Sequence, residues 1–151
     1  MKKYNIAVVG ASGNVGREIL NILNFRSFPI QELHALASSK SEGQKIVYGD
    51  DKETVIKNLE NFDFKNVDIV FSSAGSEVSK KFTPKAVKSG AIIIDNTSCF
   101  RMHKDVPLIV PEVNFEDLKH FKKKKIIANP NCSTIQMVMA LKPIHDLFEI
   151  K

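Results

Sequence analysis

Residues 6–16 read IAVVGASGNVG, an apolar run that passes into three glycines spaced three residues apart. Residues 5–9 have the continuous apolar character of a strand that is buried on both faces of a sheet. A helix is predicted directly after the glycines, because apolar residues recur there at helical spacing, and it must end before Pro29. The predicted apolar face consists of Val15, Ile19, Ile22 and Leu23. This stretch therefore predicts a strand, a tight turn and a helix.

The same alternation continues along the chain. Buried strands are predicted at residues 33–37 and 67–75 and in AIIIDNTS, and two short strands around 108–110 and 126–128. Helices are predicted at residues 76–89, broken or kinked near Pro84, and after Cys132; residues 44–59 give only weak signals. Strands alternating with helices favour an α/β fold with a mainly parallel sheet, in which ligands bind at the carboxyl ends of the strands.

Composition excludes several classes of protein. The chain has 151 residues, of which 43% are hydrophobic, which is enough for one domain with a core. No apolar run is long enough to cross a membrane and no signal peptide is apparent, so we expect a cytoplasmic protein.

The formal charge of +5 owes much to Lys122–Lys125, a predicted solvated loop without interleaved aromatic residues, so nucleic acid is not an expected partner. The two cysteines lack the spacing of a disulfide framework or a zinc site.

The glycine turn is a candidate dinucleotide site. Gly10, Gly13 and Gly16 form G-x-x-G-x-x-G between a predicted strand and a predicted helix. Glycine lets the backbone approach a pyrophosphate, and the free N–H groups and dipole at a helix start attract its negative charge. The spacing departs from G-x-G-x-x-G, and a tight turn without a ligand is the alternative.

The exit of the second predicted strand bears on which dinucleotide binds. An acidic residue at that point would hold the ribose 2′-hydroxyl of NAD. The chain instead has Ser38, Ser39, Lys40 and Ser41. Hydroxyl groups and a positive charge suit a 2′-phosphate and favour NADP. Glu42 lies nearby, and an ordinary polar loop is the alternative.

Cys132 is the candidate nucleophile. It lies in NPNCST, where a predicted strand gives way to a helix, between Asn131 and a serine. The dipole and the free N–H groups of a helix start stabilise a thiolate. The alternative is a small buried cysteine, an interpretation that suits Cys99 better.

A nucleophilic cysteine needs a base, and none of the four histidines is predicted to supply it. His145 is thirteen residues further along the same predicted helix, a separation on the order of 15–20 Å. His34, His103 and His120 are expected at the surface.

Several motifs together resemble the amino-terminal half of the aspartate-β-semialdehyde dehydrogenase family. They are, in order, VVGASGNVG, FSSAGS, IIIDNTSCFRM, PLIVPEVN and IIANPNCSTIQ. The resemblance implies a Rossmann-like, doubly wound NADP-binding domain over residues 1–151, with flanking helices and without the second catalytic and dimerisation domain. It also implies NADPH-dependent reduction of β-aspartyl phosphate to aspartate semialdehyde in lysine, diaminopimelate, methionine and threonine biosynthesis.

The resemblance also implies roles for individual residues. Cys132 would form the acyl thioester, Arg101 would bind the displaced phosphate, and Asn131 would assist at the same site. The cofactor positions would be Gly10, Ser12, Gly13, Asn14, Val15, Gly16, Ser38, Lys40, Ser41, Ser73, Ala74 and Gly75. No metal is implied.

The resemblance covers less than half of the family's chain. The remainder carries the family's general-base histidine, a glutamine, the substrate-binding arginine and most of a homodimer interface. We therefore expect an amino-terminal fragment, the product of a split gene or a deliberate truncation, which holds the site without completing the reaction. Two alternatives stay open: a dinucleotide-binding module without turnover, and a related N-acyl-glutamyl-phosphate reductase.

Overall fold

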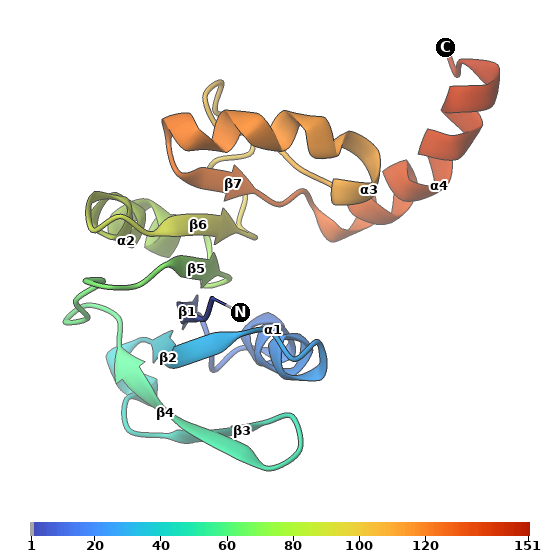
Figure 1. The fold of residues 1–151 in the computed structure, drawn as a ribbon. Helices are drawn as coiled ribbons and strands as arrows, with labels where there is room; N and C mark the ends of the chain where they lie inside the picture. Colours follow the sequence, from blue (N-terminus) through green and yellow to red (C-terminus); the bar gives the residue numbers. More distant parts are fainter. Residues whose placement is uncertain (1) are drawn as a thin grey trace.

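The computed structural model describes residues 2–151, and its centre is a seven-stranded sheet in the order β3-β4-β2-β1-β5-β6-β7 (Figure 1). All neighbouring strands pair in parallel except β3 and β4, which form an antiparallel hairpin. The strands are β1 (Tyr4–Val9), β2 (Ile30–Ala37), β3 (Lys45–Tyr48), β4 (Lys52–Asn58), β5 (Ile69–Ser72), β6 (Ile92–Asp95) and β7 (Ile126–Ala128). The predicted α/β fold with a mainly parallel sheet is confirmed.

The strand order reverses direction at β1. From β1 the chain moves outward through β2 to β4 on one side, and then through β5, β6 and β7 on the other. The carboxyl ends of β1, β2 and β5 therefore diverge around a crevice, which is where open α/β sheets bind their ligands. The glycine turn directly follows β1 and lies at this point.

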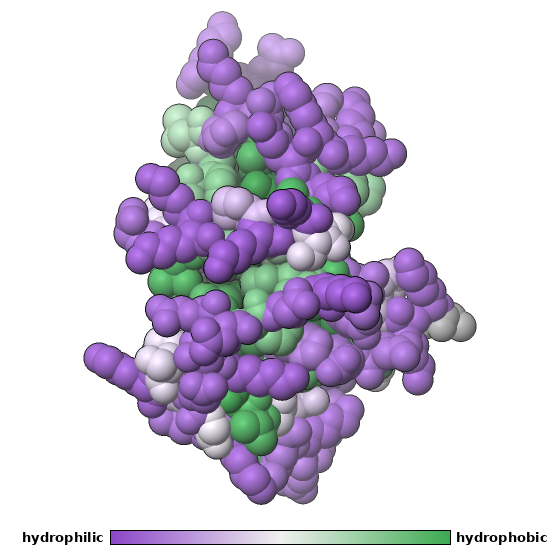
Figure 2. All heavy atoms as spheres, turned by 90° about the vertical axis from the view of Figure 1, so that its left-hand side faces the viewer, coloured by the Kyte–Doolittle hydropathy of each residue, from purple (hydrophilic) through white to green (hydrophobic). Residues whose placement is uncertain are grey.

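Helices cover both faces of the sheet. Ile6 and Val8 of β1 face the core beneath α1 (Asn14–Phe25), and Ala7 and Val9 face the core beneath α2 (Ser76–Lys88). This alternation of side chains along a buried strand confirms the doubly wound arrangement. On the left-hand side of Figure 1, polar side chains cover most of the surface, with apolar side chains visible between them (Figure 2).

The buried face of α1 differs from the predicted one. Leu20 and Leu23 are buried together with Gly16, whereas Val15 and Ile22 are exposed. The missing Cβ of Gly16 lets the start of the helix lie against the turn, so the buried face runs along Gly16, Leu20 and Leu23. Periodicity alone could not show it, because glycine is not counted as apolar.

The hairpin of β3 and β4 accounts for the stretch that gave only weak signals. Its tip packs on α1, where Gly49 takes a positive φ of 59° and its N–H donates to Asn21 Oδ1 at 3.1 Å. A Cβ on Gly49 would lie 2.0 Å from Asn24 Nδ2. Most side chains of β4 are exposed, so a hydrophobic pattern is lacking there.

Two further predictions were wrong in detail. Residues 108–110 form no strand, because only Leu108 makes a bridge, to Ala128. Helix α2 runs from Ser76 to Lys88 through Pro84, so the predicted break is wrong, while a kink at Pro84 stays a prediction. The lysine-rich segment is exposed as predicted, although it closes a 3₁₀ helix, η2 (Phe115–Lys123), that follows the short α3 (Pro111–Asn114).

The last helix, α4 (Cys132–Phe148), extends away from the sheet toward the C-terminus (Figure 1). None of its residues is buried, and Leu147 and Phe148 are each 77% exposed. Over residues 2–151, no helix combines the length and the apolar character that a membrane span requires.

Candidate active site

A cleft of about 570 Å³ lies at the carboxyl ends of β1, β2 and β5. Six of the predicted cofactor residues line it: Gly10, Ser12, Gly13, Ser38, Ser73 and Ala74. The remaining walls come from the segment after β4, including Leu59 and Phe64, and from α2. The cleft therefore joins the turns that follow three neighbouring strands.

The glycine turn is tightly packed. Gly10 has a positive φ of 85°, and a Cβ there would lie 2.8 Å from Ser73 Oγ. A Cβ on Gly16 would lie 2.2 Å from the carbonyl oxygen of Gly10, so only glycine fits. A Cβ on Gly13 would meet the same oxygen at 3.4 Å, an ordinary contact. The packing of the turn therefore requires glycine at positions 10 and 16. Gly13 is less tightly packed and lines the cleft.

The starts of two helices meet this cleft without side-chain caps. Gly13 is the N-cap of α1 and Gly75 is the N-cap of α2, and neither helix start receives a side-chain hydrogen bond. The first N–H groups of a helix need a partner, and an anion is well suited to that position. The uncapped glycine turn therefore fits the pyrophosphate of a dinucleotide.

The other predicted cofactor residues do not line the cleft. Asn14, Val15 and Gly16 form the first turn of α1, and Gly75 precedes α2. Lys40 and Ser41 lie on the 3₁₀ helix η1 (Ser39–Ser41), next to Ser38. Their roles stay predictions.

The cleft also contains charged residues that the sequence did not single out. Lys81 and Lys85 of α2 line it, as does Glu60. The two lysines are four residues apart and thus share one face of the helix. That spacing was the available signal, but it is equally typical of a solvated helix. Glu42, the acidic residue beyond β2, accepts a hydrogen bond from Asn58 Nδ2 at 3.2 Å.

Cys132 is the first residue of α4 and is exposed. Asn131 is the N-cap of this helix, and its Oδ1 accepts a hydrogen bond from the N–H of Ser133 at 3.0 Å. The same oxygen lies 4.0 Å from Cys132 Sγ. The thiol therefore stands at the positive end of a capped helix, as the sequence predicted.

Arg101 is attached to the loop that leads to Cys132. Its Nε donates to the carbonyl oxygen of Asn129 at 3.0 Å, and its Nη2 donates to that of Asn96 at 3.2 Å. In the part of the chain that the structure describes, Arg101 forms no ion pair with a carboxylate. A half-buried guanidinium bonded only to carbonyl groups keeps its charge available for an anion.

The loop that carries Arg101 is fixed to the protein by Asp95. Its carboxylate is fully buried and accepts hydrogen bonds from Ser79 Oγ at 2.6 Å and from the N–H of Thr97 at 2.7 Å. Ser98 continues the attachment through its Oγ, which lies 2.8 Å from Ser76 Oγ. The loop after β6 is thereby tied to α2.

The histidines differ in one respect from the prediction. His34 is buried at 8% exposure inside β2 and was wrongly expected at the surface. Burial lowers its pKa, and its Nδ1 lies 3.2 Å from Lys57 Nζ. His145 lies on the same helix as Cys132, as predicted. Across residues 2–151, no cluster of histidine, cysteine and acidic residues could hold a metal ion.

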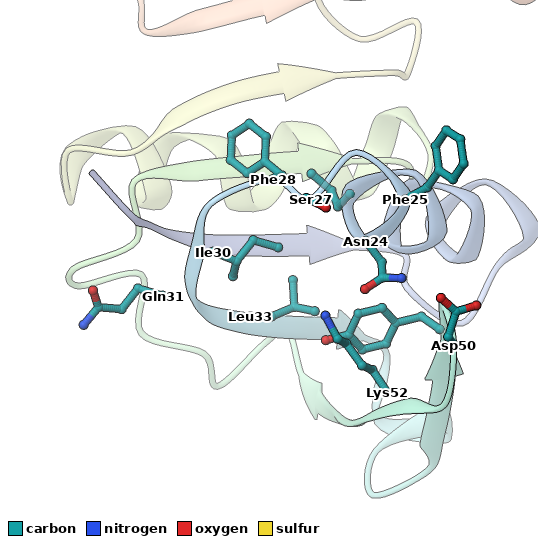
Figure 3. Close-up of a pocket in the computed structure, with 11 residues that line it drawn as sticks. Asn24, Phe25, Ser27, Phe28, Ile30, Gln31, Leu33, Asp50 and Lys52 are labelled. Carbon is teal, nitrogen blue, oxygen red and sulfur yellow. The ribbon is translucent and has the colours of Figure 1, made fainter. Parts of the chain in front are cut away.

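A second hollow has a volume of about 750 Å³ (Figure 3). It is formed by the end of α1, the start of β2 and the β3–β4 turn, including Phe28, Tyr48 and Lys52. Burial raises the pKa of Tyr48. None of the predicted site residues lines this hollow.

Residues 5–121 match the model of a known family, described as "Semialdehyde dehydrogenase, NAD binding domain". The chain belongs to this family. It is 53% identical to an aspartate-semialdehyde dehydrogenase of Rickettsia conorii over 150 residues, which cover 99% of this chain and 44% of that protein. The chain thus spans less than half the length of the curated relatives it matches.

Two solved structures support the family assignment. Aspartate semialdehyde dehydrogenase II of Vibrio cholerae, complexed with ASA, matches 96% of this chain at 49% identity with a TM-score of 0.92, over 47% of its own length. The enzyme of Candida albicans, determined with NADP, matches 99% of this chain at 28% identity with a TM-score of 0.78, over 48% of its own length. The predicted resemblance to semialdehyde dehydrogenases is confirmed.

Proposed function

We propose that residues 1–151 form the NADP-binding and nucleophile-bearing domain of an aspartate-semialdehyde dehydrogenase. The whole enzyme would reduce β-aspartyl phosphate to aspartate β-semialdehyde and phosphate. The observation that carries the proposal is the bond from Arg101 Nε to the carbonyl oxygen of Asn129. It attaches an anion-binding side chain to the segment that ends in an exposed thiol three residues later, at Cys132.

The chemistry follows from these two side chains. The thiolate of Cys132 attacks the carbonyl carbon of the acyl phosphate; a C–S bond forms, and the bond from carbon to the phosphate oxygen breaks. The departing phosphate takes the electron pair, and the guanidinium of Arg101 stabilises its charge. Asn131 holds the start of α4 and hence the thiol, and we propose that its free amide group also contacts the phosphate. NADPH, when bound, supplies the hydride that converts the thioester to the aldehyde.

The preference for NADP over NAD is part of the proposal. The one acidic side chain close behind β2, Glu42, is bonded to Asn58, while Ser38 lines the cleft and Lys40 follows it. A free positive charge at this exit suits a 2′-phosphate. We further propose that the whole enzyme is a cytoplasmic homodimer, in keeping with the family resemblance.

Calorimetric titration of the chain with NADP and with NAD tests the cofactor assignment. We expect binding of both dinucleotides, and tighter binding of NADP by about tenfold or more, the effect of one charge-assisted hydrogen bond. Lys40→Gln should remove most of this difference by weakening NADP alone. Lys88→Gln, which changes the same charge at the far end of α2, is the control and should change neither affinity.

Three results would revise the assignment. Absence of heat with either dinucleotide would contradict the function proposed for the glycine turn. Tighter binding of NAD would contradict the role of Lys40. A loss of NADP preference in Lys81→Gln but not in Lys40→Gln would place the 2′-phosphate against α2, on the lysines that line the cleft.

A further inference from the structure

We propose that the side-chain amides of Asn96 and Asn129 form a bridge that positions Arg101 relative to Cys132. Asn129 Nδ2 donates to Asn96 Oδ1 at 2.6 Å, between the loop after β6 and the loop after β7. Both asparagines are positioning residues in this inference, because they act through the guanidinium. The inference rests on the anion-binding role proposed above for Arg101.

The bridge joins two loops just beyond the last residues that pair between β6 and β7. Strand β7 has three residues, and its pairing with β6 ends at Asp95 and Ala128. On its other side, Ala128 bonds to the backbone of Pro107 and Ile109. One further backbone bond, from the N–H of Asn129 to the carbonyl oxygen of Asp95 at 2.8 Å, follows the last pair. Beyond it the chains diverge, one toward Arg101 and the other toward Cys132. The amide bridge spans the two chains at this point of divergence.

Arg101 bonds to the same two asparagines through their backbone carbonyl groups. Its Nε and Nη2 donate to the backbone carbonyl oxygens of Asn129 and Asn96, so the guanidinium lies across both loops. These bonds occupy two of its five N–H groups and leave both on Nη1 and one on Nη2. A planar guanidinium held by Nε and Nη2 still presents its Nη1–Nη2 end as a fork, which matches two oxygens of a phosphate group.

The position of the fork therefore depends on how the two carbonyl groups are spaced. If the two loops move apart, Arg101 can keep its hydrogen bond to only one of the two carbonyl oxygens. The bridge sets that spacing, because it joins the side chains of the same residues whose carbonyl groups bind the guanidinium. Asn96, Asn129 and Arg101 are all half-buried, so solvent competes less for these bonds than at an open surface.

Proton exchange of the arginine Nε–H groups, followed by ¹⁵N–¹H NMR, tests this inference on the chain itself. The sequence contains three arginines, Arg17, Arg26 and Arg101. The Nε–H signal that disappears in Arg101→Lys is that of Arg101. In the wild type we expect the Arg101 Nε–H to exchange slowly. Asn129→Ala removes the bridge but keeps the backbone carbonyl that accepts from Nε, and it should speed this exchange about tenfold by allowing local opening.

Position 96 supplies a matched pair of variants. Asn96→Leu removes the acceptor of the bridge and should also speed exchange about tenfold, whereas Asn96→Asp keeps an acceptor and should preserve slow exchange. The Nε–H of Arg17, which donates to the carbonyl oxygen of Ser12 at 3.3 Å, is an internal control and should not change. A general loss of stability would alter the signals of Arg17 and Arg101 together.

The outcome is independent of substrate and cofactor. Wild-type exchange rates at Arg101 in both Asn129→Ala and Asn96→Leu would overturn the bridge as a positioning element. Equal acceleration in Asn96→Leu and Asn96→Asp would do the same, because the acceptor would then be irrelevant. Slow exchange in the wild type together with a failure to react with an acyl phosphate would leave the bridge intact and count against the proposed function instead.

Discussion

Gly16→Ala is expected to destabilise the domain by about 3 kcal/mol and to abolish NADP binding. The new Cβ would lie 2.2 Å from the carbonyl oxygen of Gly10 and 2.8 Å from the Cα of Ala11, and these backbone atoms cannot rotate away. The start of α1 must then move off the turn, which opens the core around Leu20. The melting temperature should fall by about 6–12 °C, as expected for a domain of this size.

Gly13→Ala is the matched control in the same turn. A Cβ on Gly13 meets only the Gly10 carbonyl oxygen, at 3.4 Å, and its φ of −82° suits any residue. Because Gly13 is the N-cap residue of α1, the substitution should lower the free energy of unfolding by about 1 kcal/mol or less. Because Gly13 lines the cleft, the methyl group should still weaken NADP binding. A Gly16→Ala variant with wild-type melting temperature and NADP affinity would contradict the packing of this turn.

Alkylation by iodoacetamide at neutral pH is expected to modify Cys132 faster than Cys99 by a factor on the order of 10–100. Cys132 is exposed at the start of α4. Burial, followed by the nearby charge of Asp95, raises the pKa of the Cys99 thiol. A raised pKa leaves less reactive thiolate at any pH below it. The difference should therefore be largest at neutral pH and should narrow as the pH rises through the pKa of Cys99.

Mass mapping of the alkylated peptides at several times measures both rates in one sample. Cys132→Ser should remove the fast phase, and Cys99→Ala should leave it unchanged. Faster labelling of Cys99, or a ratio that grows with pH, would show that Cys132 has no special reactivity.

Much of the fold could be predicted because its central strands are short apolar runs that are buried wholly, as in β1, or on one face, as in β5 and β6. Strands β1, β5 and β6 are short apolar runs that each end in small or polar residues, and this pattern leaves few alternatives. The hairpin of β3 and β4 was not predictable in the same way. It lies at the edge of the sheet, and Ile46 and Ile56 are its only fully buried apolar side chains in the described structure, one on each strand, which is too few to form a hydrophobic period.

The candidate site likewise combines features that could be predicted from the sequence with features that could not. The glycine turn and the helix start at Cys132 are local features, so the sequence placed them correctly. The attachment of Arg101 joins residues 28 positions apart, and its partners are backbone carbonyl groups that carry no sequence signal. Lys81 and Lys85 enter the cleft only because the sheet places α2 beside the glycine turn.

We propose that Cys132 and Arg101 form an acyl-phosphate site in this dinucleotide-binding domain. Incubation of the chain with β-aspartyl phosphate, followed by mass mapping and a phosphate assay, tests it directly. We predict an aspartyl thioester on Cys132 with one phosphate released per adduct, no thioester in Cys132→Ser, and about tenfold slower acylation in Arg101→Leu. Absence of an adduct on Cys132, or equal acylation of Cys99, would contradict the claim and, if NADP still binds, would leave a dinucleotide-binding module without this chemistry.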